Sequence, residues 1–390
     1  MTSRSTLEPW WDRLQQRALV VGVAGIVLCG VGFFINPTQF FRSYLLAYLF
    51  WLGIPLGSLA VLMLHHLVGG AWGAVIRRVL ESATRTLPLL TLLFVPLVFG
   101  VHELYIWTRP DVVMADELLQ RKSAYLNIPF FLLRSALYFI VWLGIMYALN
   151  AWSLAQDQAE AEPAERHMRL LSGPGLVLYV LTATFAAVDW MMSLEPHWFS
   201  TLYGILVIVG QLLATLAFAV AVAVWLADTP PLAQVIAPGH FHDLGNLLLA
   251  FVMIWAYMAI SQFLIIWSAN LPEEVTWYLQ RLRGGWAWVA LVLILFYFSL
   301  PFLLLLSRGI KQRAKLLAWV ASAIFVMHLV DVFWMVVPAF QPTGVFVHWM
   351  DAAALMAIGG VWIGVFVWQL KRWPLLPVHD PGLQGASPHG

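Results

Sequence analysis

Two pairs of ionisable residues share the spacing His-x-x-Asp: His328 with Asp331, and His348 with Asp351. Both pairs stand in the last two long apolar stretches of the chain. On a helix, residues at i and i+3 share one face and can exchange a proton or a hydrogen bond. An ionisable group at bilayer depth is costly unless it is paired, hydrated or neutralised. The pairs therefore indicate that the chain handles a proton, an ion or a cofactor inside a membrane.

The composition requires a membrane protein. Of 390 residues, 62% are apolar and 11% are charged, against about 45–50% and 25% in soluble domains. Twenty acidic and 21 basic residues nearly cancel, so net charge gives no argument for binding nucleic acid. Little length remains for a soluble domain.

The single cysteine, Cys29, lies inside the first apolar stretch. It excludes an intrachain disulfide, a four-thiolate iron–sulfur cluster and a C-x-x-C-H haem attachment. We therefore assign no metal and no cofactor to this chain, and expect any redox metal in a partner. Haem b stays open as an alternative, because two facing histidines such as His102 and His328 suffice, and Ala321, Ser322 and Ala323 would leave room for the macrocycle.

Ten apolar stretches are long enough to cross about 30 Å of hydrocarbon. Lipid cannot satisfy free backbone groups, and the stretches are too long for barrel strands, so each is predicted to be a helix. We expect one polytopic, all-α membrane domain. The predicted helices cover about 18–35, 44–68, 87–107, 127–152, 171–192, 200–226, 243–268, 285–306, 315–338 and 347–370.

Lysine and arginine orient the predicted bundle. They concentrate at the N-terminus, in the second, fourth and eighth loops, and just after the last helix. The positive-inside rule then places both termini in the cytoplasm, with 371–390 as a cytoplasmic tail. The residues counted on this side are Arg4, Arg13, Arg17, Arg77, Arg78, Arg85, Arg166, Arg169, Arg308, Lys311, Arg313, Lys371 and Arg372.

With this orientation, polar residues occupy both halves of the membrane. Because the unperturbed pKa of histidine lies near neutrality, two half-paths for protons that meet at the bundle centre are one interpretation. The outer half holds His102, Glu103, Arg134, Asp189, His348 and Asp351, with His328 and Asp331 deeper. The inner side holds His65, His66, His240, His242 and Asp243, and Gln211, Ser261 and Gln262 lie between.

Simpler interpretations exist for several of these residues. The inner histidines could be interfacial or capping residues, and Asp243 could cap the seventh helix. Arg134 and Glu103 could form a structural ion pair between helices three and four. For Asp189, His328 and Asp331 a functional role is favoured, because they lie deeper and are harder to explain otherwise.

Three stretches resemble one family: FWLGIPLGSLAVLMLHHLVGGAWG at 50–73, DWMMSLEPHWFSTLYG at 189–204 and SQFLIIWSANLPEE at 261–274. They are similar to the F-type membrane subunits of alternative complex III, a bacterial quinol:electron-acceptor oxidoreductase. These subunits resemble the NrfD or polysulfide-reductase membrane anchors, in which two four-helix bundles lie side by side with extra helices at the edges. The resemblance covers most of the chain from the second predicted helix to the tenth.

The resemblance implies both partners and a role. The partners would be multihaem cytochrome c subunits, a large periplasmic iron–sulfur subunit, the paralogous C subunit and small membrane subunits, so that haem c and iron–sulfur clusters are expected in partner chains. Quinol oxidation is attributed chiefly to the C subunit, and F-type subunits are implicated in a proton route. By this resemblance, the candidate proton-path residues of this chain are Asp189, His328, Asp331, His348 and Asp351.

Three hypotheses for function follow. The leading one is a supporting membrane subunit with a proton path coupled to quinol oxidation. The second is a subunit that itself binds quinol and passes electrons to a periplasmic iron–sulfur partner, with a base such as His102 or His348 accepting protons. The third is an independent proton-coupled transporter. Copurification with haem-bearing chains would distinguish the first two from the third.

Overall fold

The computed structural model describes residues 9–158, 161–230 and 232–376, and the regular elements among them are all helical. Within this part of the chain, ten segments are long and apolar enough to cross a membrane. The prediction of an all-α membrane protein is thus confirmed. The segments are α1 (Pro9–Ile35), α2 (Pro37–Val68), α3 to α5 (Ala71–Thr84, Leu87–Leu92 and Val95–Phe99), α9 (Ile128–Gln158), α10 (Ala161–Trp190), α11 (Tyr203–Leu226), α12 (Pro238–Ala269), α14 (Trp286–Val292) continuing into α15 (Leu300–Leu306), α17 (Ala314–Val336) and α18 (Trp349–Arg372).

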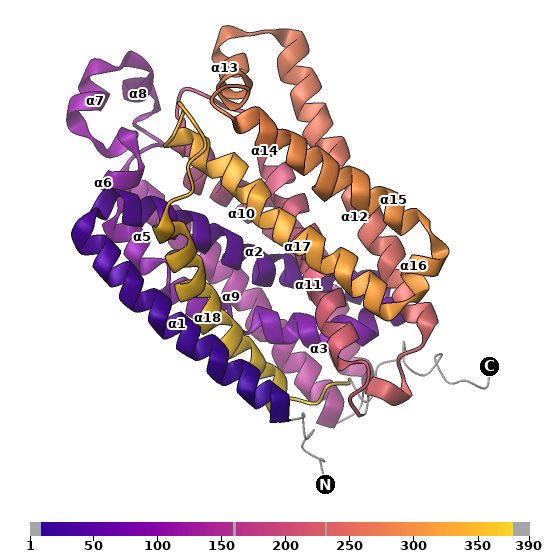
Figure 1. The fold of residues 1–390 in the computed structure, drawn as a ribbon. Helices are drawn as coiled ribbons and strands as arrows, with labels where there is room; N and C mark the ends of the chain where they lie inside the picture. The colour runs from indigo at the N-terminus through magenta and orange to yellow at the C-terminus, as the bar shows by residue number, and fades with distance from the viewer. Residues whose placement is uncertain (1–8, 159–160, 231, 377–390) are drawn as a thin grey trace.

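Short helices connect the spans, and they lie at the two ends of the bundle (Figure 1). The end where α1 begins and α18 ends is called the terminal face; there Lys371 Nζ lies 2.6 Å from Asp12 Oδ1. The other end, called the opposite face, carries all but one of the connecting helices named below. The connecting helices are α6 (Val101–Leu104), α7 (Pro110–Ala115), α8 (Glu117–Lys122), α13 (Pro272–Arg281) and, towards the terminal face, α16 (Arg308–Gln312).

Two groups of four spans meet at the centre. In the first, α2 packs against α3 and α10, and α10 packs against α9; in the second, α11 packs against α12 and α17, and α12 packs against the span that contains α15. The helices α2 and α11 join the groups, so α2 is buried almost throughout. The remaining spans, α1 and α18, lie side by side along one edge (Figure 1). This arrangement agrees with the two-bundle architecture that the family resemblance implies.

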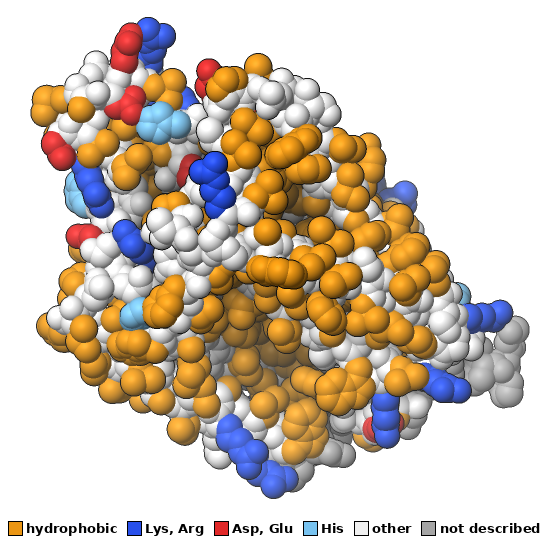
Figure 2. Space-filling model, turned by 45° about the horizontal axis from the view of Figure 1, so that its top comes forward, with side chains coloured by type: hydrophobic (Ala, Val, Ile, Leu, Met, Phe, Trp, Pro, Cys, Tyr) orange, Lys and Arg blue, Asp and Glu red, His pale blue; other side chains and the backbone are white. Residues whose placement is uncertain are grey.

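The surface of the bundle is suited to lipid. In Figure 2 hydrophobic side chains cover the middle of the visible face, and the charged side chains gather mostly towards its two ends. Exposed apolar residues such as Phe34 on α1, Leu181 on α10 and Ile294 after α14 would face hydrocarbon. The hydrophobic effect between helices is weak in lipid, so close packing must hold the spans together.

The third span differs from the prediction. A helix was expected over 87–107, with Arg77, Arg78 and Arg85 in the preceding loop. Instead the span begins at Ala71, and Arg77 and Arg78 are buried within α3. Pro88 and Pro96 stand in the first turns of α4 and α5, where a missing backbone N–H costs least. The other nine spans match the predicted stretches apart from their ends, and residues 377–390 of the predicted tail lie outside the described residues.

Backbones approach closely between α1 and α18. A Cβ added at Gly25 would lie 2.4 Å from the backbone nitrogen of Ala357, and one added at Gly360 would lie 2.3 Å from that of Gly22. Small residues at such crossings let membrane helices gain van der Waals contact along their backbones. The pair of edge helices therefore depends on these glycines.

We expect Gly25→Ala to lower the free energy of unfolding by about 1–3 kcal/mol, the usual cost of overpacking. The backbone of α18 would have to move, since no flexible side chain can give way. Gly30→Ala is the matched control, because a Cβ there meets nothing within 4 Å. Thermal unfolding in detergent would measure both variants. Equal melting temperatures for the two would contradict the close contact.

Candidate functional site

The first His-x-x-Asp pair lies at the centre of the second helix group. The side chains of His328 and Asp331, both on α17, are 4% and 6% exposed. His328 Nδ1 lies 3.9 Å from Asp331 Oδ2, and Tyr297 Oη lies 3.1 Å from the same nitrogen. On the other side, Trp255 Nε1 donates to Asp331 Oδ2 at 3.3 Å. The pair is thus held by hydrogen-bonding aromatic residues from two further segments.

A small cavity adjoins this pair. Its volume is about 20 Å³, enough for one water molecule, which needs about 10–15 Å³. Gly210 leaves room for the pair, because a Cβ there would lie 3.1 Å from His328 Cε1 and 3.4 Å from Asp331 Oδ2. The polar lining residues of the cavity, Gln211, His328 and Asp331, can form hydrogen bonds with a water molecule at this position. The lining comprises Leu49, Met191, Val207, Gln211, His328, Asp331, Val332 and Met335.

Tyr297 owes its position to an irregular helix. Between α14 and α15 the chain forms a π-helical segment, Leu293–Ser299. Such segments are rare and occur frequently at functional sites, because the extra residue rotates the side chains that follow. Here Tyr297 is fully buried against Trp255, with ring centroids 4.5 Å apart. Sequence reasoning missed both aromatic residues, because an apolar run such as LILFYFS does not reveal a π turn.

The chemistry of this centre is that of proton exchange. The ionisable neighbour of Asp331 is His328, at 3.9 Å, and no lysine or arginine pairs with Asp331 among the described residues. Without a fixed cation, a buried carboxyl can be either neutral or ionised according to its surroundings. The phenol of Tyr297, the imidazole and one water could pass a proton to or from it. Gln211 is linked to the same region by Tyr179 Oη, which donates to Gln211 Oε1 at 3.3 Å.

Asp189 is held very differently. Arg134 binds both of its carboxylate oxygens, through Nε at 2.8 Å and Nη2 at 2.9 Å, and Tyr138 Oη donates at 2.7 Å. Asp189 is fully buried. A bidentate guanidinium pair fixes both charge and geometry. The arrangement is that of a structural ion pair between α9 and α10, in which both carboxylate oxygens are already bound.

The expected ion pair between Arg134 and Glu103 does not form, because Arg134 is taken by Asp189. Glu103, in α6, instead accepts a hydrogen bond of 2.5 Å from Thr38 Oγ1. Its neighbour His102 is exposed at the opposite face. The haem alternative needs His102 and His328 to face one another, but His328 is buried in the bundle, where its Nδ1 lies 3.1 Å from Tyr297 Oη. Among the described residues, no group of three or more His, Cys, Asp and Glu could hold a metal ion.

The second His-x-x-Asp pair caps a helix. His348 is the N-cap of α18, and its Nδ1 accepts from the backbone N–H of Met350 at 3.2 Å. In return, Asp351 Oδ2 accepts from the backbone N–H of His348 at 2.8 Å. Ser43 Oγ donates to the other oxygen of Asp351 at 2.5 Å. The two side chains thus bind backbone groups in a reciprocal capping arrangement.

The remaining candidates lie near the terminal face. His65 and His66 end α2, and His65 packs edge-on against Trp72. At the start of α12, the backbone N–H of Ala237 donates to His240 Nδ1 at 3.0 Å. His242 Nδ1 lies 3.5 Å from Asp243 Oδ1 and 3.3 Å from Asn246 Nδ2. His240 therefore serves α12 as a cap, as the simpler interpretation held.

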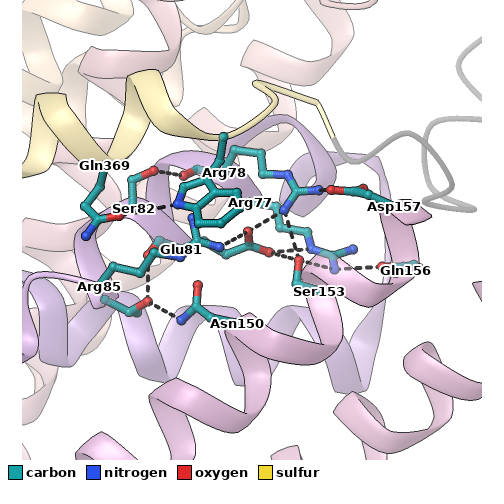
Figure 3. Close-up of polar contacts among 12 residues, drawn as sticks. Arg77, Arg78, Glu81, Ser82, Arg85, Asn150, Ser153, Gln156, Asp157 and Gln369 are labelled. Carbon is teal, nitrogen blue, oxygen red and sulfur yellow. Dashed lines mark hydrogen bonds and ion pairs between the residues drawn. The ribbon is translucent and has the colours of Figure 1, made fainter. Parts of the chain in front are cut away.

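A buried charge network that we did not predict from the sequence joins α3 to α9 (Figure 3). Glu81 is fully buried; its Oε1 lies 2.9 Å from Arg77 Nε, and its Oε2 lies 2.7 Å from Arg78 Nη1. Ser153 Oγ donates to Glu81 at 2.5 Å, and Arg78 also pairs with Asp157. The network explains how these arginines can lie inside a span, because each has charged and hydrogen-bonding partners.

Two of the stretches that carry the family resemblance meet at the opposite face. Arg281 of α13 is buried and donates to Glu195 at 3.0 Å and to the backbone oxygen of Met335 at 2.9 Å. Burial lowers the pKa of Arg281, which the charge of Glu195 opposes. Trp198 stacks on Trp277 at 4.8 Å and donates to the backbone oxygen of Glu274 at 3.1 Å. Arg281 thus connects this unit to Met335, which lies one helical turn after Asp331 in α17.

No family model matches the chain, and no curated protein matches it either.

Proposed function

We propose that this chain is a membrane subunit of a bacterial quinol-oxidising complex of the alternative complex III type, and that it provides a proton path through the membrane. The resemblance of its three sequence stretches supports the first part. Trp198 of the second stretch donates a hydrogen bond to the backbone of Glu274 in the third, so these two stretches belong to one structural unit. The partners would be multihaem cytochrome c subunits, a periplasmic iron–sulfur subunit, a paralogous C subunit and small membrane subunits.

One observation carries the proton path: a carboxyl without a fixed cation lies beside an imidazole, a phenol and a water-sized cavity. Ionisable groups inside membrane bundles are expensive and mark ion or proton pathways. The structural ion pair of Asp189 and the capping roles of His348 and Asp351 make these three weaker candidates. The central station of the path is therefore Asp331 with His328.

From this centre the path reaches the opposite face through Glu195. The cavity beside Asp331 is lined by Met335 and Met191, and the backbone of Met335 is bonded to Arg281, the partner of Glu195. Glu195 in turn lines an open cavity of about 280 Å³ together with His197 and Gln280. We propose this route, in place of one past His348, as the outer half of the path.

Copurification tests the assignment as a subunit. An affinity tag on this chain should recover, from native membranes in mild detergent, chains that carry haem c and a quinol oxidation activity with a cytochrome acceptor. In sealed vesicles, that activity should release protons that a pH-sensitive dye detects. Recovery of the chain alone, free of haem absorbance and of quinol oxidation, would instead favour the independent transporter.

The orientation proposed is a bacterial inner-membrane protein with its terminal face in the cytoplasm. The terminal face carries Arg308, Arg313 and Lys371 among many cations, and the opposite face carries fewer. Under the positive-inside rule the richer face stays inside. Alkaline phosphatase fused after Met114 in α7 should be active, because this enzyme folds only outside the cytoplasm. Activity after Gln312 instead would reverse the orientation.

A further inference from the structure

A polar cavity opens to the membrane surface near the terminal face. It has a volume of about 500 Å³ and lies between α3 and α4, α9 and α18. Its polar wall is formed by Arg85, Asn150 and Arg372, and its apolar wall includes Pro88, Leu89 and Leu154. A basic upper part above an apolar lower part matches the division of a phospholipid into headgroup and acyl chains.

Arg85 supplies a guanidinium without adequate partners. Its side chain is 8% exposed, yet its Nη1 and Nη2 atoms make no hydrogen bond among the described residues. The acidic group that it approaches is Glu81, whose nearest oxygen is 3.6 Å away and is already bound by Arg78 at 2.7 Å. Two buried donors therefore lack an acceptor among the residues that the structure describes.

Asn150 supplies the opposite kind of group. Its amide nitrogen donates to Thr84 Oγ1 at 3.0 Å and to the backbone oxygen of Met146 at 2.9 Å, which fixes the orientation of the amide. Its Oδ1 is buried and accepts no hydrogen bond among the described residues. Asn150 lines the cavity, and in Figure 3 no dashed line reaches this oxygen, so it lacks a donor such as a hydroxyl group.

A second cation stands at the mouth. Arg372 lies over the Trp373 ring at 5.4 Å, and Arg85 lies over the same ring at 4.8 Å. Two guanidinium groups near one indole repel each other unless an anion lies between them. Below them, exposed Tyr147 and Leu92 continue the apolar wall along the lipid-facing surface of α9 and α4.

We propose that this cavity binds one anionic phospholipid whose headgroup carries a hydroxyl, as phosphatidylglycerol does. The phosphate accepts from Arg85 and Arg372, the headgroup hydroxyl donates to Asn150 Oδ1, and the acyl chains lie along Leu89 and Leu154. Basic pockets between spans commonly hold anionic headgroups on the cytoplasmic side of a membrane. The bound lipid would complete the charge network of α3, since Arg85 is its one member without a close carboxylate.

Native mass spectrometry of the purified full chain, with any partners it retains, tests the site. Titration with dipalmitoyl phosphatidylglycerol should give one tightly bound lipid, and dipalmitoyl phosphatidylethanolamine should bind more weakly. Arg372→Gln should weaken the phosphatidylglycerol adduct by about fivefold, the effect of one juxtamembrane cation on an anionic lipid. Arg85→Gln should weaken it more, because that guanidinium is buried.

Arg372 is exposed, so its variant should fold normally even if Arg85→Gln does not. Arg169→Gln is the matched control: it removes an exposed charge from the same face but outside the cavity. Unchanged lipid binding in Arg372→Gln, or an equal loss in Arg169→Gln, overturns the proposal. Displacement of the lipid by millimolar inorganic phosphate also overturns it, because the site would then recognise free phosphate.

Discussion

Replacing Glu81 with alanine is expected to lower the free energy of unfolding by about 3–5 kcal/mol, the range measured when one partner of a buried ion pair is removed. The substitution would leave Arg77 and Arg78 buried beside one another without the carboxylate that both contact at less than 3 Å. It would also free Ser153 Oγ, whose acceptor is Glu81. The effect is measured by heating the protein in detergent and recording the fraction of the chain that stays soluble at each temperature.

The control for this prediction is an ion pair of the same type at the surface. Glu117 and Arg121 of α8 are 79% and 76% exposed and pair at i and i+4, as Glu81 and Arg77 do. Exposed pairs contribute little because water screens them. Glu117→Ala should therefore leave the melting temperature unchanged. A Glu81→Ala protein as stable as Glu117→Ala would show that the network is not held together by its charges.

The spans were predictable because hydrocarbon imposes a simple rule of length and apolarity. The rule failed where α3 begins, since Arg77, Arg78 and Glu81 lower the local hydropathy although they neutralise one another when buried. The signal was present in the spacing: a glutamate at i+3 and i+4 from two arginines is the pattern of a helical ion pair. These residues were predicted to lie in a loop because the cost of burying each charge was considered without its partner.

The partners of the candidate site residues were not predictable from spacing. Arg134 and Asp189 lie 55 positions apart, and their pairing depends on how α9 packs against α10. Glu103 is nearer to Arg134 along the chain than Asp189 is, yet it lies in the separate short helix α6. Tyr297 and Trp255 were hidden in apolar runs, because a buried aromatic residue becomes a proton or hydrogen-bond donor only when the fold turns it towards an acceptor.

The two His-x-x-Asp pairs show why position matters as much as spacing. His348 follows a loop and immediately precedes an apolar run, which is where capping residues stand, and its pair binds backbone N–H groups. His328 lies within a continuous apolar helix, where the backbone is already bonded, so its side chain and that of Asp331 are left to contact other side chains. Identical spacing thus gives a cap in one place and an interior polar pair in the other.

Asp331→Asn is expected to leave the complex assembled but to lower proton transfer through it by about 100-fold, the lower range for removing a positioned proton-transfer group. Asparagine keeps the shape of aspartate and can still accept the hydrogen bond of Trp255, so packing around α17 should survive. It cannot take up and release a proton, however. Quinol-driven proton release from sealed vesicles, normalised to the amount of haem-containing complex, measures the change.

Asp351→Asn is the matched control, because it makes the same substitution in the other His-x-x-Asp pair. That carboxylate accepts from Ser43 and from the backbone of His348, so losing its charge should cost about 1 kcal/mol of stability through a weaker cap and leave proton release intact. The difference between the variants separates a proton station from a helix cap. Normal proton release in Asp331→Asn, or an equal loss in both variants, would remove Asp331 from the path.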